Sequence, residues 1–73
     1  MEVRSKLAHL VPHWIEHNAS HAEQFGEWAG RARAAGLAKV ASHLEAAVKL
    51  MTAANAEIEH ARIGLAHGES DHD

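Results

Sequence analysis

The chain contains no cysteine and no tyrosine, and it has one proline, one phenylalanine and two tryptophans. The absence of cysteine excludes disulfides, thiolate metal sites and iron–sulfur clusters. Any bound metal ion must therefore be held by imidazole, carboxylate, amide carbonyl or water. These ligands suit zinc, iron, nickel, cobalt, manganese or copper(II) better than copper(I).

The sequence also has no concentrated block of one charge and no long apolar run. Its seven Lys and Arg are scattered among ten Asp and Glu, for a formal net charge of −3. Nucleic-acid binding requires a concentrated positive face, so we expect no nucleic-acid partner. No apolar run is long enough to span a bilayer, and the N-terminal segment lacks the apolar core and cleavage site of a signal peptide. We therefore expect no membrane insertion and a cytoplasmic location.

Histidine, by contrast, is abundant, with eight residues in a chain of 73. Four of them, His9, His13, His17 and His21, follow a strict four-residue spacing. On a helix, residues four apart lie one above the other on nearly the same face. Neighbouring members of this series can hold one metal ion with two imidazoles from a single helix. This is the strongest functional indication in the sequence, although it identifies neither the metal nor its purpose.

Apolar residues recur at three- and four-residue steps and predict one all-α domain over residues 1–73. We expect one helix over about 4–35, a second over about 37–66 and a frayed tail over 68–73. Gly36 stands where a helix commonly ends in a left-handed residue. Pro12 leaves the first helix open to two interpretations. It starts that helix, or it kinks one that begins near Arg4, and the apolar pattern before Pro12 favours the second.

A turn near Gly36 folds the two helices antiparallel, so residues equally distant from the turn should face each other. The apolar stripes of the two helices agree with this register, and so do their polar interruptions. The predicted pairs are Leu7 with Leu65, Trp14 with Ile58, Asn18 with Asn55, Phe25 with Val48, and Trp28 with Leu44. The predicted fold is an antiparallel two-helix hairpin.

A lone hairpin cannot cover all of its apolar residues. Four aliphatic residues lie beside the central seam, and both tryptophans are large. Stable helical domains need more helix faces in contact than two helices provide. We expect a homodimer that forms a four-helix bundle, with docking onto a larger protein complex as the alternative. The residues beside the seam are Leu10, Ile15, Leu50 and Ile63.

The helix phase predicts a metal site on one flank of the hairpin. His17 lies beside the seam, His13 lies further out, and antiparallel packing brings Glu57 toward both. Two imidazoles and a carboxylate match open catalytic zinc sites and non-haem iron sites. The predicted cofactor is a divalent transition metal, namely zinc, nickel, cobalt or iron. The predicted ligands are His13, Glu16, His17, His21, Glu57 and His60.

Two ordinary interpretations stand beside this prediction. The histidines can be surface residues of an amphipathic helix. Asn18, His21 and Asn55 interrupt the apolar seam at one level, and buried polar residues in helix pairs often fix register or oligomeric state without another function.

The segment from Glu57 to His60 has the Glu-x-x-His pattern of ferritin-like di-iron bundles, which place one such motif on each of two helices. A dimer would supply two copies of the motif, and Glu16 would supply the additional carboxylates. The run from Glu57 to Ala61 resembles the corresponding segment of encapsulated ferritins. Those proteins are small helical hairpins that form metal sites by dimerising and act as ferroxidases. This resemblance implies a di-iron site with oxidase activity.

A longer resemblance covers Leu10 to Ala56. The segment His13-Trp14-Ile15-Glu16-His17-Asn18 is similar to one in a small prokaryotic family of histidine-bearing helical hairpins of unknown function. The resemblance implies that this helix face is characteristic of the family. It implies no activity, so function must be argued from the site itself.

The sequence therefore predicts a small metal-binding protein for metal storage, delivery or sensing, with no turnover of its own. The first alternative is a structural accessory subunit that docks on a larger complex through Trp14 and Trp28. The second alternative is a di-iron oxidase site formed by dimerisation.

Overall fold

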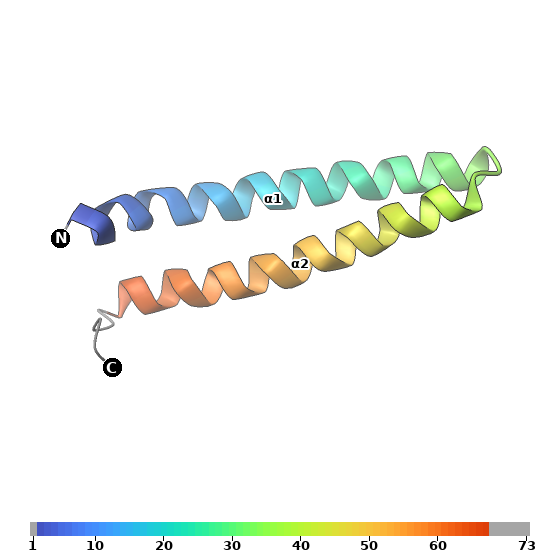
Figure 1. Ribbon diagram of the computed structural model, residues 1–73. Coiled ribbons are helices and arrows are strands. Elements are labelled where there is room, and N and C mark those ends of the chain that lie inside the picture. The colour runs from blue at the N-terminus through green and yellow to red at the C-terminus, as the bar shows by residue number, and fades with distance from the viewer. Residues whose placement is uncertain (1, 68–73) are drawn as a thin grey trace.

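The computed structural model describes residues 2–67 and shows two helices, α1 over Glu2–Ala34 and α2 over Ala38–Ala66. The helices run antiparallel, so the start of α1 and the end of α2 lie at the same end of the hairpin (Figure 1). Each helix boundary lies within two residues of the sequence-based prediction, and no strand occurs among the described residues. The all-α hairpin is confirmed, while the predicted frayed tail over 68–73 lies outside the described residues.

Helix α1 continues through Pro12 without interruption. A proline inside a helix removes one backbone hydrogen bond and crowds the preceding turn, at a cost of about 3 kcal/mol. The neighbouring Val11 is 3% exposed against α2, and this packing next to the proline offsets part of the cost. The interpretation in which α1 begins at Pro12 is therefore wrong, and the helix that was expected to begin near Arg4 is confirmed, with its start at Glu2.

The turn is a Schellman motif centred on Gly36, which has φ +85°. The Leu37 N–H donates to the Ala32 carbonyl oxygen at 2.8 Å, and the Gly36 N–H donates to the Arg33 carbonyl oxygen at 3.1 Å. These two bonds satisfy the last carbonyls of α1. A side chain at this left-handed position would cost about 1–2 kcal/mol, which is why glycine suits it. The predicted role of Gly36 is confirmed.

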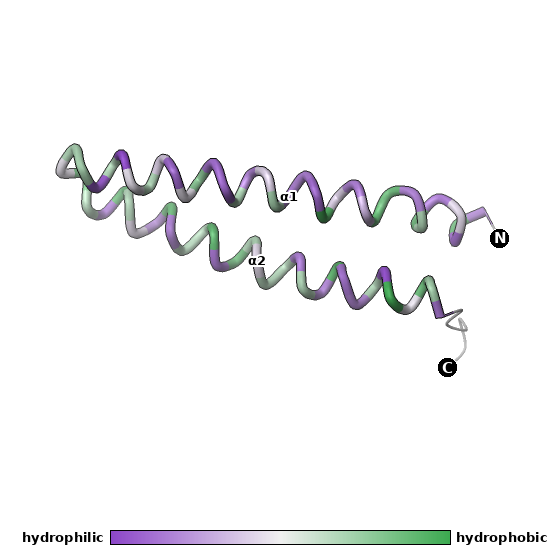
Figure 2. The backbone as a smooth tube through the Cα atoms, turned by 180° about the vertical axis from the view of Figure 1, so that it is seen from behind, coloured by the Kyte–Doolittle hydropathy of each residue, from purple (hydrophilic) through white to green (hydrophobic). Residues whose placement is uncertain are grey.

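The seam between the helices is thin. Only three of the described residues are buried, with exposed fractions of 3% for Val11, 2% for Ala29 and 0% for Ala41. Ala29 and Ala41 lie near the turn, where their small size lets the helices come close, and the helices lie closer there than at their far ends in both views (Figures 1 and 2).

This close approach corrects one predicted pair. Trp28 was expected to face Leu44 across the seam, but 57% of its surface is exposed. The adjacent Ala29 takes the inward position instead. A tryptophan between the helices at this level would hold them further apart than the short turn allows. The indole lies on the flank, with the Arg31 guanidinium carbon 4.6 Å from the ring centroid.

The hairpin is a rod that measures 52 × 20 × 14 Å, with a radius of gyration of 16.4 Å. A compact chain of this length would have a radius of gyration of about 11 Å. Hydrophilic residues recur along the whole of α1 (Figure 2). Because each helix has one packing partner in this structure, most of its circumference faces solvent.

Candidate metal-binding site

The four-residue histidine series lies on α1, and three of its imidazoles form a row with Phe25. The rings of His17 and His21 are in contact, with centroids 4.4 Å apart and planes at 79°. His13 stacks on His17 with centroids 6.0 Å apart, and His21 stacks on Phe25 at the same separation. The helical spacing predicted from the sequence therefore brings neighbouring imidazoles together.

The closest contact in this row joins two nitrogen atoms. The Nε2 atoms of His17 and His21 lie 3.0 Å apart. Two neutral imidazoles hold this distance by sharing one proton, with one ring donating and the other accepting. A metal ion can take the place of that hydrogen bond when both neutral rings carry their proton on Nδ1, because both Nε2 lone pairs are then free to coordinate. With metal–nitrogen bonds of 2.0–2.1 Å, two imidazole nitrogens lie about 2.9 Å apart at a right angle and about 3.4 Å apart in a tetrahedron. The observed separation falls within this range.

Solvent reaches the pair without any rearrangement of the chain. His17 is exposed and His21 is half-buried beside the seam. An ion can therefore approach from the flank, and its remaining coordination positions point away from the hairpin. A site of this kind has two ligands from one chain and is open on its outer side.

The other predicted ligands are exposed as well. His13, Glu16, Glu57 and His60 all have exposed side chains. Among residues 2–67, no three His, Asp or Glu side chains are grouped so that they could hold one ion. The structure therefore brings His17 and His21 to chelating distance and places His13 next to them. It shows no contact between these rings and Glu57 within the described part of one chain.

The Glu57 to His60 segment carries an ion pair of its own. The Arg62 guanidinium donates to both carboxylate oxygens of Glu59, with Nε 3.0 Å from each. This hydrogen bonding lowers the pKa of the Glu59 carboxyl, and the positive charge of Arg62 adds to the effect. The carboxylate of Glu59 is thus already engaged.

A polar layer formed by Asn18 and Asn55 fixes the position of the histidine pair along the axis of α2. The Asn18 Nδ2 donates to the Asn55 Oδ1 at 3.0 Å, and the Asn55 Nδ2 donates to the Ile15 carbonyl oxygen at 3.0 Å. The predicted Asn18–Asn55 pair is confirmed. A one-turn slip would break both bonds and leave half-buried amides unpaired, so this layer specifies the register.

Large apolar side chains surround the histidine pair on the same flank of α1. Leu10 is 37% exposed, Trp14 is 41% exposed and Trp28 is 57% exposed. Val3 belongs to the same row. Along the row, each member is separated from the next by three, four or seven residues, which are helical spacings. We call this row the Trp–His stripe, and it consists of Val3, Leu10, Trp14, His17, His21 and Trp28.

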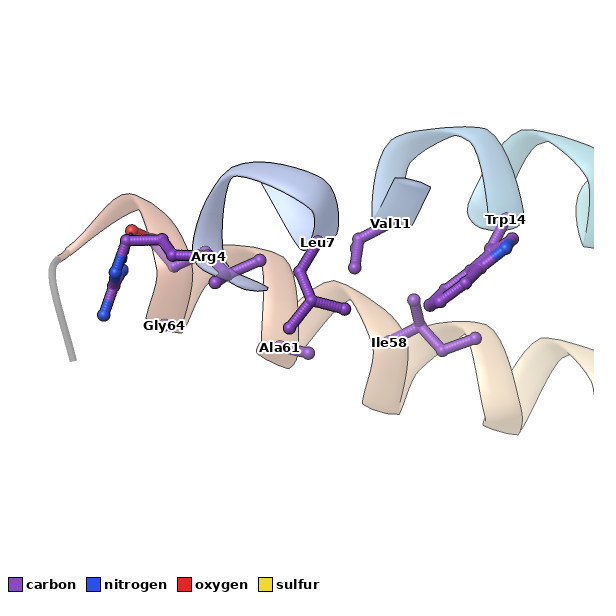
Figure 3. Close-up of a pocket in the computed structure, with 8 residues that line it drawn as sticks. Arg4, Leu7, Val11, Trp14, Ile58, Ala61 and Gly64 are labelled. Atoms are coloured by element: carbon purple, nitrogen blue, oxygen red, sulfur yellow. Dashed lines mark hydrogen bonds between the residues drawn. The ribbon is translucent and has the colours of Figure 1, made fainter. Parts of the chain in front are cut away.

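A shallow groove of about 340 Å³ lies next to the stripe at the open end of the hairpin (Figure 3). Trp14 lies over Ile58 there, and Leu7 points toward Ala61. The Arg4 Nη1 closes the end of the groove by donating to the Leu65 carbonyl oxygen at 2.9 Å. The groove is lined by both members of two predicted pairs, as the predicted register requires. These pairs are Trp14 with Ile58 and Leu7 with Leu65.

Neither the groove nor the continuous stripe was predicted from the sequence. Leu10 was expected beside the seam, whereas Trp14 and Trp28 were expected in the seam itself. The regular three- and four-residue steps through Leu10, Trp14, His17 and His21 are the signal that could have identified a second face. Several members of this second pattern are sequence neighbours of seam residues, as Leu10 is of Val11 and His17 is of Asn18. The two patterns therefore overlap in the sequence, and the seam pattern hides the second one.

Neither α1 nor α2 has the length and apolar character that a bilayer-spanning helix requires.

Comparisons with known proteins place the chain in a family without giving it an activity. No curated protein and no solved structure matches the chain. A family profile described as a domain of unknown function (DUF8180) matches residues 7–65, which include both asparagines of the polar layer and the histidine pair. With most of its length matched, the chain belongs to the DUF8180 family.

Proposed function

We propose that this protein binds a divalent transition-metal ion through His17 and His21, and that it serves metal storage, delivery or sensing without turnover of its own. The observation that carries the proposal is the 3.0 Å separation of the two Nε2 atoms. Imidazole suits zinc, nickel, iron and copper(II), and zinc is the first ion to test because it accepts nitrogen ligands at this spacing.

The remaining predicted ligands belong to the proposal as additional donors. His13 stacks on His17 and can exchange with it as the outer ligand of a second four-residue pair. Glu16, Glu57 and His60 are exposed and available to an ion shared between chains. We also propose that the hairpin self-associates into a four-helix bundle, because large apolar side chains flank the pair and no described helix covers them. The expected cytoplasmic location stays a prediction.

Isothermal titration of zinc into metal-free protein, purified without a histidine tag, tests the metal proposal. We expect tight binding that is lost in His17→Ala and in His21→Ala. His43 is an exposed histidine on α2 outside the predicted ligand set, so His43→Ala is the matched control and should bind as the natural chain does. Equal affinity in all four proteins would refute histidine chelation by this pair.

Protons should compete with the metal ion. A histidine must be neutral to coordinate, and the side chain ordinarily titrates near pH 6.5. We expect zinc affinity to fall as the pH is lowered through about 6. A competition titration that shows constant affinity from neutral to acidic pH would exclude imidazole ligands.

The exposed indoles favour a second candidate, a structural accessory subunit that docks on a larger complex. Trp14 and Trp28 present large apolar surfaces beside the groove, and aromatic residues of this kind are common in protein interfaces. A stable monomer with no metal affinity would support this candidate. Two irons for each dimer in metal analysis would instead identify the di-iron oxidase arrangement of Glu16, Glu57 and His60.

A further inference from the structure

We propose that a second copy of this chain docks on the Trp–His stripe about a two-fold axis, and that four imidazoles hold one metal ion between the copies. The ligands are His17 and His21 together with the partner's His17 and the partner's His21. This inference rests on the proposed metal-binding function and adds the partner, the register and the stoichiometry.

The stripe has the spacing of a helix–helix interface. Its members recur in steps of three, four and seven residues, which is the pattern by which two helices pack along their whole length. The stripe runs beside the seam that α2 occupies and is separate from it. Most of its members are exposed, from 37% for Leu10 to 66% for Val3. The hairpin therefore carries a second packing face that its own second helix does not use.

The stripe is complementary to itself when two copies of α1 run antiparallel. A two-fold axis at the level of Ala19 places residues equally distant from Ala19 opposite each other. His17 then faces the partner's His21, and Leu10 faces the partner's Trp28. Imidazole therefore meets imidazole and leucine meets tryptophan, so four of the six stripe members pair with one another, as a symmetric interface requires. Trp14 and Val3 lie opposite the partner's Gln24 and the partner's Ala35.

Helix α2 supports the same axis independently. The Asn18–Asn55 hydrogen bond sets the hairpin register, and this register places Ala54 at the level of Ala19. Ala47 and Ala61 lie one heptad before and after Ala54. Ala61 lines the groove together with Trp14, so this alanine row is on the same side of the hairpin as the stripe. Small side chains here let α2 approach the partner's α2 closely.

The exposed area of the hairpin matches what a dimer needs. The chain exposes 5632 Å². A compact monomer of 7.9 kDa would expose about 4,400 Å². The excess of roughly 1,200 Å² exceeds the roughly 800 Å² that each partner buries in a protein interface of standard size.

The coordination number of zinc also favours two copies. A zinc ion prefers four ligands in a tetrahedron. One hairpin supplies two imidazoles whose Nε2 atoms lie 3.0 Å apart, and a small rotation of the exposed His17 ring would widen this to the tetrahedral separation of about 3.4 Å. A second pair related by the two-fold axis supplies the other two. The site is half-built in one chain and closed in the dimer, so metal binding and dimer formation should stabilise each other.

Titration of zinc followed by sedimentation velocity tests the stoichiometry. We expect one zinc for two chains, a zinc-dependent shift from monomer to dimer, and reversal by a chelator. The His17→Ala/His21→Ala double variant should not respond to zinc. Tight binding of one zinc to each chain with no change in mass would overturn this inference and leave the proposed function standing. Absence of zinc binding would overturn both.

A cysteine placed at the axis tests the register. The natural chain has no cysteine, so a single substitution gives an unambiguous crosslink. Ala54→Cys should be oxidised to a disulfide-linked dimer in zinc-loaded protein, because the two thiols meet at the axis. Ala56→Cys is the matched control, since Ala56 is also exposed but points away from the alanine row. Equal crosslinking of the two variants, or crosslinking of Ala56→Cys alone, would overturn the antiparallel arrangement.

Discussion

The two faces that flank the seam differ in whether their side chains find interaction partners within one chain. On one face, Arg33 pairs with Glu45 across the helices at 2.8 Å, and Arg62 pairs with Glu59 along α2. On the other face, two imidazoles share one contact among exposed indoles. The ion-pair face is complete in one chain, whereas the Trp–His stripe has ring nitrogens and apolar surface available to a ligand or a partner. Both faces carry exposed side chains, so exposure does not distinguish them. They differ because one face has charged side chains paired with each other and the other has imidazoles and apolar side chains.

The largest effect that would test this difference concerns the metal. His17 is four residues from both His13 and His21, so it takes part in either chelating pair. We expect His17→Ala to weaken zinc affinity by more than the roughly 10–100-fold typical of losing a residue that merely supports a ligand. His9→Ala should change affinity little because His9 is exposed and lies off the stripe. Helicity measured by circular dichroism should stay the same in both variants.

His72→Ala provides a second control for this titration, although His72 lies outside the described residues. Equal zinc affinity in the His17, His9 and His72 variants would mean that the four-residue series is an accident of surface composition.

The next effect concerns self-association. Leu10 on the stripe and Ile63 off it are almost equally exposed, at 37% and 41%. We expect Leu10→Glu to weaken the dimer by about 30-fold or more, because a charge buried without a partner costs at least about 2 kcal/mol. Ile63→Glu should leave the dimer unchanged. Sedimentation equilibrium of both variants measures this contrast, and equal weakening would show that the stripe has no special role.

A smaller effect concerns the polar layer that positions the stripe. Asn55 takes part in two hydrogen bonds, and Asn18 takes part in one of them. At about 1 kcal/mol for each bond, Asn55→Ala should cost about 2 kcal/mol of unfolding free energy and Asn18→Ala about 1 kcal/mol. For a domain of this size, each kcal/mol lowers Tm by about 4–8 °C. Thermal melts at one protein concentration test this order, and a larger loss in Asn18→Ala would contradict it.

The smallest effect concerns the ion-pair face. Because the hydrogen bond from Arg62 lowers the pKa of Glu59, the folded chain favours the charged carboxylate. The resulting stabilisation is present above the ordinary glutamate range and is lost as the pH falls through the lowered pKa. Glu59→Gln should therefore make stability slightly less sensitive to acid, as urea melts at pH 7 and about pH 3 would show. A large change would be inconsistent with an exposed pair.

Much of the fold could be predicted because it depends on local rules. The three- and four-residue apolar steps predicted both helices, and Gly36 predicted the turn, since few other residues adopt its backbone conformation. The Asn18–Asn55 pair was predictable because the two asparagines interrupt the two apolar stripes at matching distances from the turn, so the antiparallel register places them opposite each other.

The site was predictable only in part. The four-residue spacing predicted the contact between His17 and His21, because a helix fixes the relative position of residues four apart. The expected approach of Glu57 to these histidines required the distance and rotation between two helices, which no local pattern specifies. Trp28 was placed in the seam because it falls in the apolar pattern of three- and four-residue steps, but the narrow space beside Ala29 and Ala41 leaves it on the flank.

The two helices, their turn, their register and the spacing of the histidines can all be derived from the amino-acid sequence, because each follows from backbone geometry over a few residues. Which side of α1 is covered by α2, and which side is left as the Trp–His stripe, can be seen only in the folded hairpin. That choice depends on how closely the helices pack, and the packing is set jointly by small side chains from both helices, Ala29 on one and Ala41 on the other.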